Sequence, residues 1–362
     1  MSAPLLLSLL RDPGAAFTLP EWDLLLRQAG SANMVARLYA LLEQCGALER
    51  VPAQARAHLQ WAHVAAQRHR QAVRWEVGKI AEALADVGAP TILLKGAAYA
   101  IADLPPAAGR LFSDIDILVP KAVLDETESM LMVHGWVATH LDAYDQRYYR
   151  DWMHELPPME HQIRGTSIDV HHAILPETAK ARPDPALLRA GAVAIPGRPG
   201  LYTLAPTDIV LHSATHLMYE GEFDHGLRDL GDIHSLLLHY GADAAFWPAL
   251  TARAAELQLG RPLFYALRYA ARLLHTPVPA HAFDALHAAR PPAALLTLMD
   301  WLFARALLPK HPSCTTAGSG AARFMLYLRG NWLRMPPLLL ARHLFHKAFF
   351  SPKKTDDAPA QQ

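Results

Sequence analysis

The sequence predicts an α/β (α+β) core with a mixed sheet, flanked by helical N-terminal and C-terminal regions. Short apolar segments with strand-like alternation fill the middle of the chain, a glycine turn joins a strand to a helix there, and long helical patterns lie on both sides. We expect five segments: a helical N-terminal region at 1–88, the α/β core at 89–175, a proline-rich linker at 176–206, a helical C-terminal domain at 207–350 and a disordered tail at 351–362.

The N-terminal region is predicted to consist of helices. Residues 20–46 carry apolar side chains at helical spacing and should form two helices, broken near Gly30 and Ser31. Residues 53–88 contain almost no residue that breaks a helix, so we expect one long helix there.

The segment 112–119 is the most informative strand of the core. It alternates polar and apolar residues, so Asp114 and Asp116 should share one face while Ile115 and Ile117 point to the other. Two neighbouring carboxylates repel each other unless a cation lies between them, and such oxygen-rich pairs suit magnesium. By the same reasoning, neutralising either aspartate should leave the stability of the metal-free protein unchanged or raise it. Two solvated aspartates on an exposed strand face are the alternative.

A strand-to-helix turn precedes this strand. Residues 89–96 predict a short buried strand and residues 97–102 the start of a helix. Gly96 at the turn would let backbone N–H groups approach a phosphate. Lys95 lies beside it, and Arg110 could hold phosphate oxygens with its guanidinium fork. An ion pair between Arg110 and a nearby aspartate is about as well supported.

A third carboxylate follows the strand pair downstream. Residues 165–174 predict a strand, and residues 159–164 predict its hairpin partner. Asp169 should face the same surface as Asp114 and Asp116 if the sheet is continuous. Three carboxylates on one sheet face, beside a glycine turn, make a two-metal site for phosphoryl transfer a reasonable prediction.

These motifs together resemble the uncharacterised nucleotidyltransferase family of the polymerase-beta-like nucleotidyltransferase superfamily. The resemblance is carried by Leu94-Lys95-Gly96, Arg110, the segment 114–119 and Ile168-Asp169-Val170-His171. It covers residues 90–174 well and extends more loosely to 204–212 and 227–232. Each motif is weak alone, whereas their ordered combination is fairly specific.

The resemblance implies a nucleotidyltransferase core that uses magnesium, with two ions expected. It implies metal ligands, and catalytic roles, for Asp114, Asp116 and Asp169. It also places Gly96 in the nucleotide-phosphate turn. The wider superfamily usually has Gly-Ser at this turn, whereas this chain has Gly96-Ala97. The serine hydroxyl is therefore missing, and Lys95 and Arg110 are the candidates to replace its contact with phosphate.

The rest of the chain offers weaker signals. Residues 121–135 predict a helix, and the aromatic, irregular stretch 144–158 could form part of an acceptor pocket. His212 and His216 share one face of a predicted helix, but helix packing or a substrate contact explains them better than a metal site. An internal ion-pair cluster is the simplest explanation for the charges Asp224, Arg228, Asp229 and Asp232.

Composition limits the compartment and the partners. The formal net charge is zero, with 34 basic and 34 acidic residues, so nothing suggests bulk binding of nucleic acid. Two cysteines fit a reducing compartment, and we expect a cytoplasmic protein without a signal peptide or a membrane span. Residues 331–350 could form an amphipathic helix on a membrane surface, its regular part starting after Pro336 and Pro337. Packing on the protein core explains the same pattern and is more common.

The predicted function is metal-dependent transfer of a nucleotidyl group from a nucleoside triphosphate, such as ATP, to an unidentified small-molecule, protein or RNA acceptor. Pyrophosphate would be released. The main alternative is a catalytically inactive nucleotide-binding or partner-binding module with the same fold. A metal-dependent phosphohydrolase using Asp169, His171 and His172 is a third reading, although the sequence shows no complete set of histidine and aspartate ligands for it.

Overall fold

A mixed seven-stranded sheet organises the computed structural model, which describes residues 4–139, 142, 146–219 and 221–336. The strand order is β3-β4-β5-β2-β1-β7-β6. The pairs β2/β5 and β1/β7 are parallel, and the other neighbours are antiparallel. The strands are β1 Thr91–Leu93, β2 Asp114–Leu118, β3 Trp136–Ala138, β4 Met159–His161, β5 Ser167–His171, β6 Val193–Ala194 and β7 Leu201–Thr203. This mixed sheet, with helices around it, fits the predicted α/β class.

The N-terminal helices end where the sequence predicts breaks. They are α1 Leu5–Arg11, α2 Leu19–Ser31, α3 Val35–Gln44 and α4 Ala53–Ala83. Thr18 and Glu21 form a capping box that starts α2. Asn33, with φ of +54°, turns the chain between α2 and α3. The predicted break near Gly30 and Ser31 and the predicted long helix are therefore confirmed.

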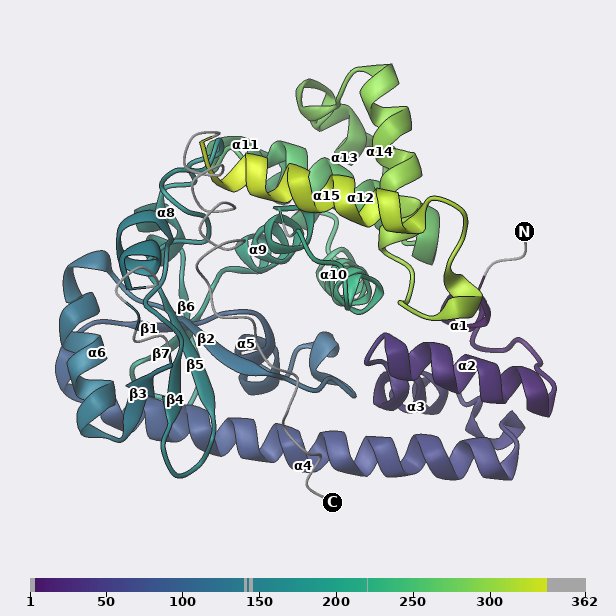
Figure 1. The fold of residues 1–362 in the computed structure, drawn as a ribbon, viewed down its shortest axis with the longest axis horizontal. Helices are drawn as coiled ribbons and strands as arrows, with labels where there is room; N and C mark the ends of the chain where they lie inside the picture. The colour runs from purple at the N-terminus through teal and green to yellow at the C-terminus, as the bar shows by residue number, and fades with distance from the viewer. Residues whose placement is uncertain (1–3, 140–141, 143–145, 220, 337–362) are drawn as a thin grey trace.

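Helix α4 connects two hydrophobic cores. Figure 1 shows it running along one side of the molecule, beneath the sheet at one end and beside α2 and α3 at the other. Leu59 lies in the core shared with the N-terminal and C-terminal helices. Val77 and Ile80 lie in the second core, between α4 and the sheet. The helix thus holds one face of the sheet at a fixed place relative to the rest of the chain.

Strand β2 separates these two cores. Ile115 and Ile117 point into the core next to α4, whereas Leu118 belongs to the core of the C-terminal helices. This alternation follows from the two-residue period of a strand. Asp116 shares the Leu118 face, so its carboxylate points toward the C-terminal helices and is buried there.

Two helices complete the central region, α5 Lys95–Ile101 and α6 Leu124–Val133. The segment 176–206, expected to be a linker with a short element inside it, contains α8 Pro185–Ala190 and the strands β6 and β7. Strand β7 pairs in parallel with β1 and so belongs to the sheet. The sequence did not reveal this, because strands of two and three residues between prolines are too short to show alternation.

The C-terminal region is helical, as predicted. Its helices are α9 Pro206–Tyr219, α10 Gly226–Tyr240, α11 Phe246–Glu256, α12 Gly260–Leu274, α13 Ala280–Ala285, α14 Ala293–Ala306 and α15 Ser319–Arg334. No helix in the described part of the chain is both long and apolar enough to span a bilayer.

The first residues of the expected amphipathic segment belong to an earlier helix. Residues 331–334 lie in α15, which ends at Arg334, before Pro336. A residue that precedes proline disfavours helical backbone angles, so a helix normally stops there. Residues 337–362, which include most of the expected amphipathic segment and the expected tail, lie outside the described residues.

Candidate active site

The sheet brings Asp116 and Asp169 together. Strands β2 and β5 run parallel with Asp116 opposite Asp169, and Asp114 lies two residues earlier on the same face of β2. Neighbouring strands are only about 4.8 Å apart, so these two side chains are adjacent. The hairpin of β4 and β5 that supports Asp169 was predicted and is confirmed.

Two cationic groups contact the buried carboxylate of Asp116. Lys95 Nζ donates a hydrogen bond of 3.1 Å to Oδ1, and His171 Nε2 lies 2.9 Å from the same oxygen. Burial alone would raise the pKa of Asp116, but Lys95 and His171 outweigh it and lower the pKa below its ordinary value. The carboxylate is therefore ionised and held in place at neutral pH.

His171 links Asp116 to a further carboxylate, Glu155. The Nδ1 atom of His171 lies 3.0 Å from Glu155 Oε2, while Nε2 contacts Asp116. Burial lowers the pKa of His171, but its bonds to the two carboxylates raise it overall, to about 10. Burial raises the pKa of Glu155, and the bond from His171 lowers it, to about 2. His171 is thus an imidazolium that donates to both carboxylates.

The pKa of Asp169 is raised, whereas that of Asp116 is lowered. Burial, followed by repulsion from Asp116, raises the pKa of Asp169 to about 7. Repulsion from Asp116 contributes to this shift, and a cation bound between the two carboxylates would relieve that repulsion.

This shift predicts how stability depends on pH without metal. The ordinary pKa of Asp169 is 3.8, so above it the unfolded chain loses this proton while the folded chain keeps it up to about pH 7. The contribution of Asp169 to stability is therefore fully present below pH 3.8 and is lost as the pH rises through 7. In chelator, wild type should lose about 2 kcal/mol relative to Asp169→Asn between about pH 5 and about pH 8. Denaturant melts check this, and parallel pH profiles for the two proteins would contradict it.

A strained turn places Lys95 beside the carboxylates. Lys95 has φ of +39°, an uncommon value for a residue with a side chain, at the start of α5. Such strain costs on the order of 1–3 kcal/mol and tends to occur at functional sites. Lys95 and Gly96 line a cavity of about 130 Å³, together with Asp114 and Asp116. We call it the central cavity. It is smaller than the roughly 300–1,000 Å³ of pockets that enclose a small ligand, so it has room for part of a nucleotide.

Gly96 and Asp114 have neighbours that the sequence did not show. A Cβ atom on Gly96 would lie 2.4 Å from Cδ1 of Phe112, so the ring of Phe112 packs directly on this glycine. Close packing alone therefore requires a glycine here. The carboxylate of Asp114 accepts a hydrogen bond of 2.8 Å from the Ser113 hydroxyl and lines the central cavity.

Arg110 is bound by carboxylates of α10. It pairs with Asp232 and, at 3.4 Å, with Asp229, and burial lowers its pKa to about 10. The ion pair that the sequence offered as an alternative for Arg110 thus exists, but its partners come from α10 instead of β2. Arg110 still lines the central cavity.

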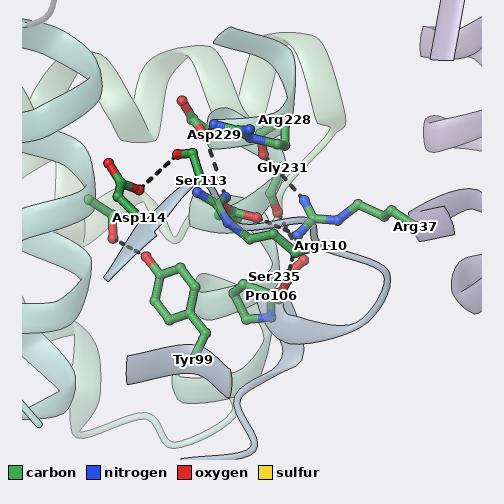
Figure 2. A network of polar contacts seen from close by, with 12 residues as sticks. Arg37, Tyr99, Pro106, Arg110, Ser113, Asp114, Arg228, Asp229, Gly231 and Ser235 are labelled. Atoms are coloured by element: carbon green, nitrogen blue, oxygen red, sulfur yellow. Dashed lines mark hydrogen bonds and ion pairs between the residues drawn. The ribbon is translucent and has the colours of Figure 1, made fainter. Parts of the chain in front are cut away.

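The ion pairs around Arg110 join three parts of the chain (Figure 2). Arg37 of α3 also pairs with Asp232 and donates to the carbonyl of Pro106 at 3.0 Å. Arg228 pairs with Asp229 at 2.9 Å. The internal ion-pair cluster predicted on this helix is therefore present, except that Asp224 pairs with Lys310 instead. The cluster fixes the wall of the central cavity opposite the sheet.

Several residues of the site could not be assigned from the sequence. Glu155 lies in an irregular segment, and only its pairing with β5 brings it to His171. His171 was foreseeable as a neighbour of Asp169, because residues two apart on a strand share a face. His212 is buried and His216 is partly buried on α9, where desolvation lowers the pKa of both, that of His212 to about 3. Neutral imidazoles packed in the core agree with the predicted packing role, and His216 also lines the central cavity.

The donor atoms present fit a hard divalent cation. Among the described residues, ligand atoms of Asp116, Asp169 and His171 lie within 4.8 Å of one another, as do those of His154, Glu155 and His171. Because both nitrogens of His171 donate to carboxylates, the oxygens of Asp116 and Asp169 are the atoms left to hold the cation. Asp114 is not part of either group, although its charge also raises the pKa of Asp169. Carboxylate oxygens are the ligands that magnesium prefers.

Comparison with known proteins supplies one further finding. A family model described as "Uncharacterised nucleotidyltransferase" matches residues 18–275, a span that includes α3, the whole sheet and α9 to α12. Neither the curated proteins nor the solved structures gave a match.

Proposed function

The chain belongs to the uncharacterised nucleotidyltransferase family, and we propose that it transfers a nucleotidyl group from a nucleoside triphosphate to a hydroxyl or amine acceptor, releasing pyrophosphate. One observation carries the proposal: Asp116 and Asp169 face each other on parallel strands, with Asp114 on the same face and a strained Lys95-Gly96 turn beside them. This arrangement combines a carboxylate site for cations with a site for phosphates.

The proposed reaction assigns each residue a task. The acceptor oxygen or nitrogen forms a bond to the α-phosphorus, and the bond from that phosphorus to the oxygen bridging to the β-phosphate breaks. The bridging oxygen keeps the electron pair and leaves with pyrophosphate. The proton of the acceptor passes to Asp169, the carboxylate beside Asp116. His171 holds Asp116 in position through its bond of 2.9 Å.

Magnesium would be held by Asp114, Asp116 and Asp169, and two ions are expected. When bound, it would neutralise the triphosphate and make the acceptor more acidic. The turn at Lys95 and Gly96 would hold the phosphates, with Arg110 in the wall of the same cavity.

A second candidate function has its own support in the structure. Lys95 and His171 already neutralise Asp116 with cations of the protein itself. A buried carboxylate satisfied in this way is compatible with a nucleotide-binding module that has lost turnover. In the enzyme, by contrast, the ammonium of Lys95 would turn from Asp116 to the triphosphate when metal binds.

The products released distinguish these functions. The purified protein is incubated with each nucleoside triphosphate, magnesium and a cell extract as the source of acceptor, and the products are assayed. Magnesium-dependent release of pyrophosphate above the extract alone supports the transferase. Orthophosphate released by the protein without extract would indicate a phosphohydrolase, and binding without any product would indicate the module.

Lys95→Ala should raise the dissociation constant of the nucleoside triphosphate about 30-fold, because a charge-assisted bond to phosphate is worth on the order of 2 kcal/mol. Arg110→Ala should have a smaller effect, since Asp229 and Asp232 already hold that guanidinium. Lys121→Ala, at an exposed lysine paired with Glu177, is the control. Calorimetric titration checks all three. If Lys95→Ala and Arg110→Ala both bind the triphosphate as tightly as wild type does, then neither residue contacts the phosphates and both have structural roles.

A further inference from the structure

A second cavity adjoins the central cavity across Phe112. It has a volume of about 370 Å³ and lies between α4, the start of β2 and the turn that joins β4 to β5. Phe112, Ser113 and Asp114 line both cavities. We call this second space the Trp75 cavity. Its volume falls in the range of pockets that hold small ligands, which the central cavity does not reach.

The walls of the Trp75 cavity offer flat, rigid stacking surfaces. Trp75 is 54% exposed although it lies on a helix that packs against the sheet. The guanidinium of Arg164 lies 5.5 Å from the centroid of the Trp75 ring and 4.8 Å from that of Trp136, so it supports the Trp75 ring from one side. Arg164 is held there by a bidentate pair with buried Glu76, with distances of 2.6 and 2.9 Å. Aromatic rings and guanidinium planes are the groups on which nucleobases stack.

The position of the cavity relative to the carboxylates suggests its occupant. In an in-line transfer the acceptor and the leaving pyrophosphate lie on opposite sides of the α-phosphorus. The Lys95-Gly96 turn would hold the pyrophosphate, and Asp169, the proposed base, must lie near the acceptor. Asp169 does not line the Trp75 cavity, whereas Asp114 does. The third substituent of the α-phosphorus is the nucleoside. The Trp75 cavity, which Asp114 lines, could hold this nucleoside.

We propose that the Trp75 cavity binds the nucleobase of the triphosphate, stacked against Trp75. This inference rests on the proposed function and adds to it the residues that would recognise the nucleoside. Because Glu76 is already paired with Arg164, the wall supplies stacking more than base-specific hydrogen bonds. Stacking of this kind tolerates different bases.

The test compares ATP with inorganic triphosphate, which lacks the nucleoside, in magnesium-containing buffer. Trp75→Ala should weaken ATP binding about tenfold and leave triphosphate binding unchanged, since stacking on an aromatic side chain contributes only with a base present. Trp75→Phe should bind ATP nearly as wild type does. Trp61→Ala is the matched control, because Trp61 is 77% exposed on the same helix and lines neither cavity.

A second variant tests the cavity by filling it. Ala72 is exposed and lines the Trp75 cavity, so Ala72→Trp should block ATP and spare inorganic triphosphate. Wild-type affinity for ATP in both Trp75→Ala and Ala72→Trp would overturn the inference while leaving the proposed function intact. Equal losses for ATP and triphosphate would also overturn it. Failure of the wild-type protein to bind either ligand would overturn the inference together with the proposed function.

Discussion

Asp116→Asn should abolish nucleotidyl transfer and lower the free energy of unfolding of the metal-free protein by about 3 kcal/mol. Asp116 is 3% exposed and contacts both Lys95 and His171, so an amide leaves the partly buried Lys95 without its counter-charge and His171 with Glu155 alone. It also removes a metal ligand from the proposed site. Pyrophosphate release measures the first effect, and denaturant unfolding in chelator measures the second.

Asp23→Asn is the control for Asp116→Asn. Asp23 pairs with Arg27 on the exposed surface of α2, where loss of an ion pair should change stability by less than about 1 kcal/mol. Wild-type activity in Asp116→Asn would rule out the metal site. Unchanged stability would agree with the sequence-based argument from like-charge repulsion, and would contradict the pairing seen with Lys95 and His171.

Asp169→Asn should reduce turnover by ~100-fold or more while the dissociation constant of the triphosphate stays nearly constant. An asparagine keeps the size of the side chain but cannot accept the proton of the acceptor. Single-turnover rates at saturating triphosphate measure the first quantity, and calorimetric titration of the triphosphate measures the second.

Glu160→Gln is the control for Asp169→Asn. Glu160 is an exposed carboxylate on β4, the strand beside β5, and lies opposite Ser167. The substitution Glu160→Gln should leave both turnover and triphosphate binding unchanged. A variant Asp169→Asn that loses nucleotide binding, yet keeps its rate at saturation, would assign Asp169 a binding role instead.

Local patterns made the centre of the site predictable. The alternation in 112–119 is enough to place Asp114 and Asp116 on one face of the strand and Ile115 on the other. The structure confirms that Ile115 is buried in the core next to α4. The turn before β5 indicated the hairpin and therefore the strand that carries Asp169. Each of these features depends on residues a few positions apart, where strand geometry alone determines the outcome.

Contacts between distant segments were not predictable in this way. Arg110 forms an ion pair with Asp232, which lies more than a hundred residues later in the sequence. Glu155, in an irregular segment, pairs with His171. Strand β7 belongs to the sheet because it pairs in parallel with β1, although its three residues are too few to show the alternation of a strand. Such pairings depend on the packed fold, so a single sequence contains no local signal for them.

The most direct test of nucleotidyl transfer compares two positions of label. The purified protein is incubated with magnesium, cell extract and ATP labelled at either the α-phosphate or the γ-phosphate. A second set with the other nucleoside triphosphates extends the test to other bases, and extract-free samples reveal self-labelling. We expect an acceptor to gain label from the α-phosphate only, with the γ-label leaving in pyrophosphate, and Asp116→Asn to transfer neither. Transfer of the γ-label beyond that in extract alone, or no movement of the α-label with any of the four nucleotides, would contradict the account.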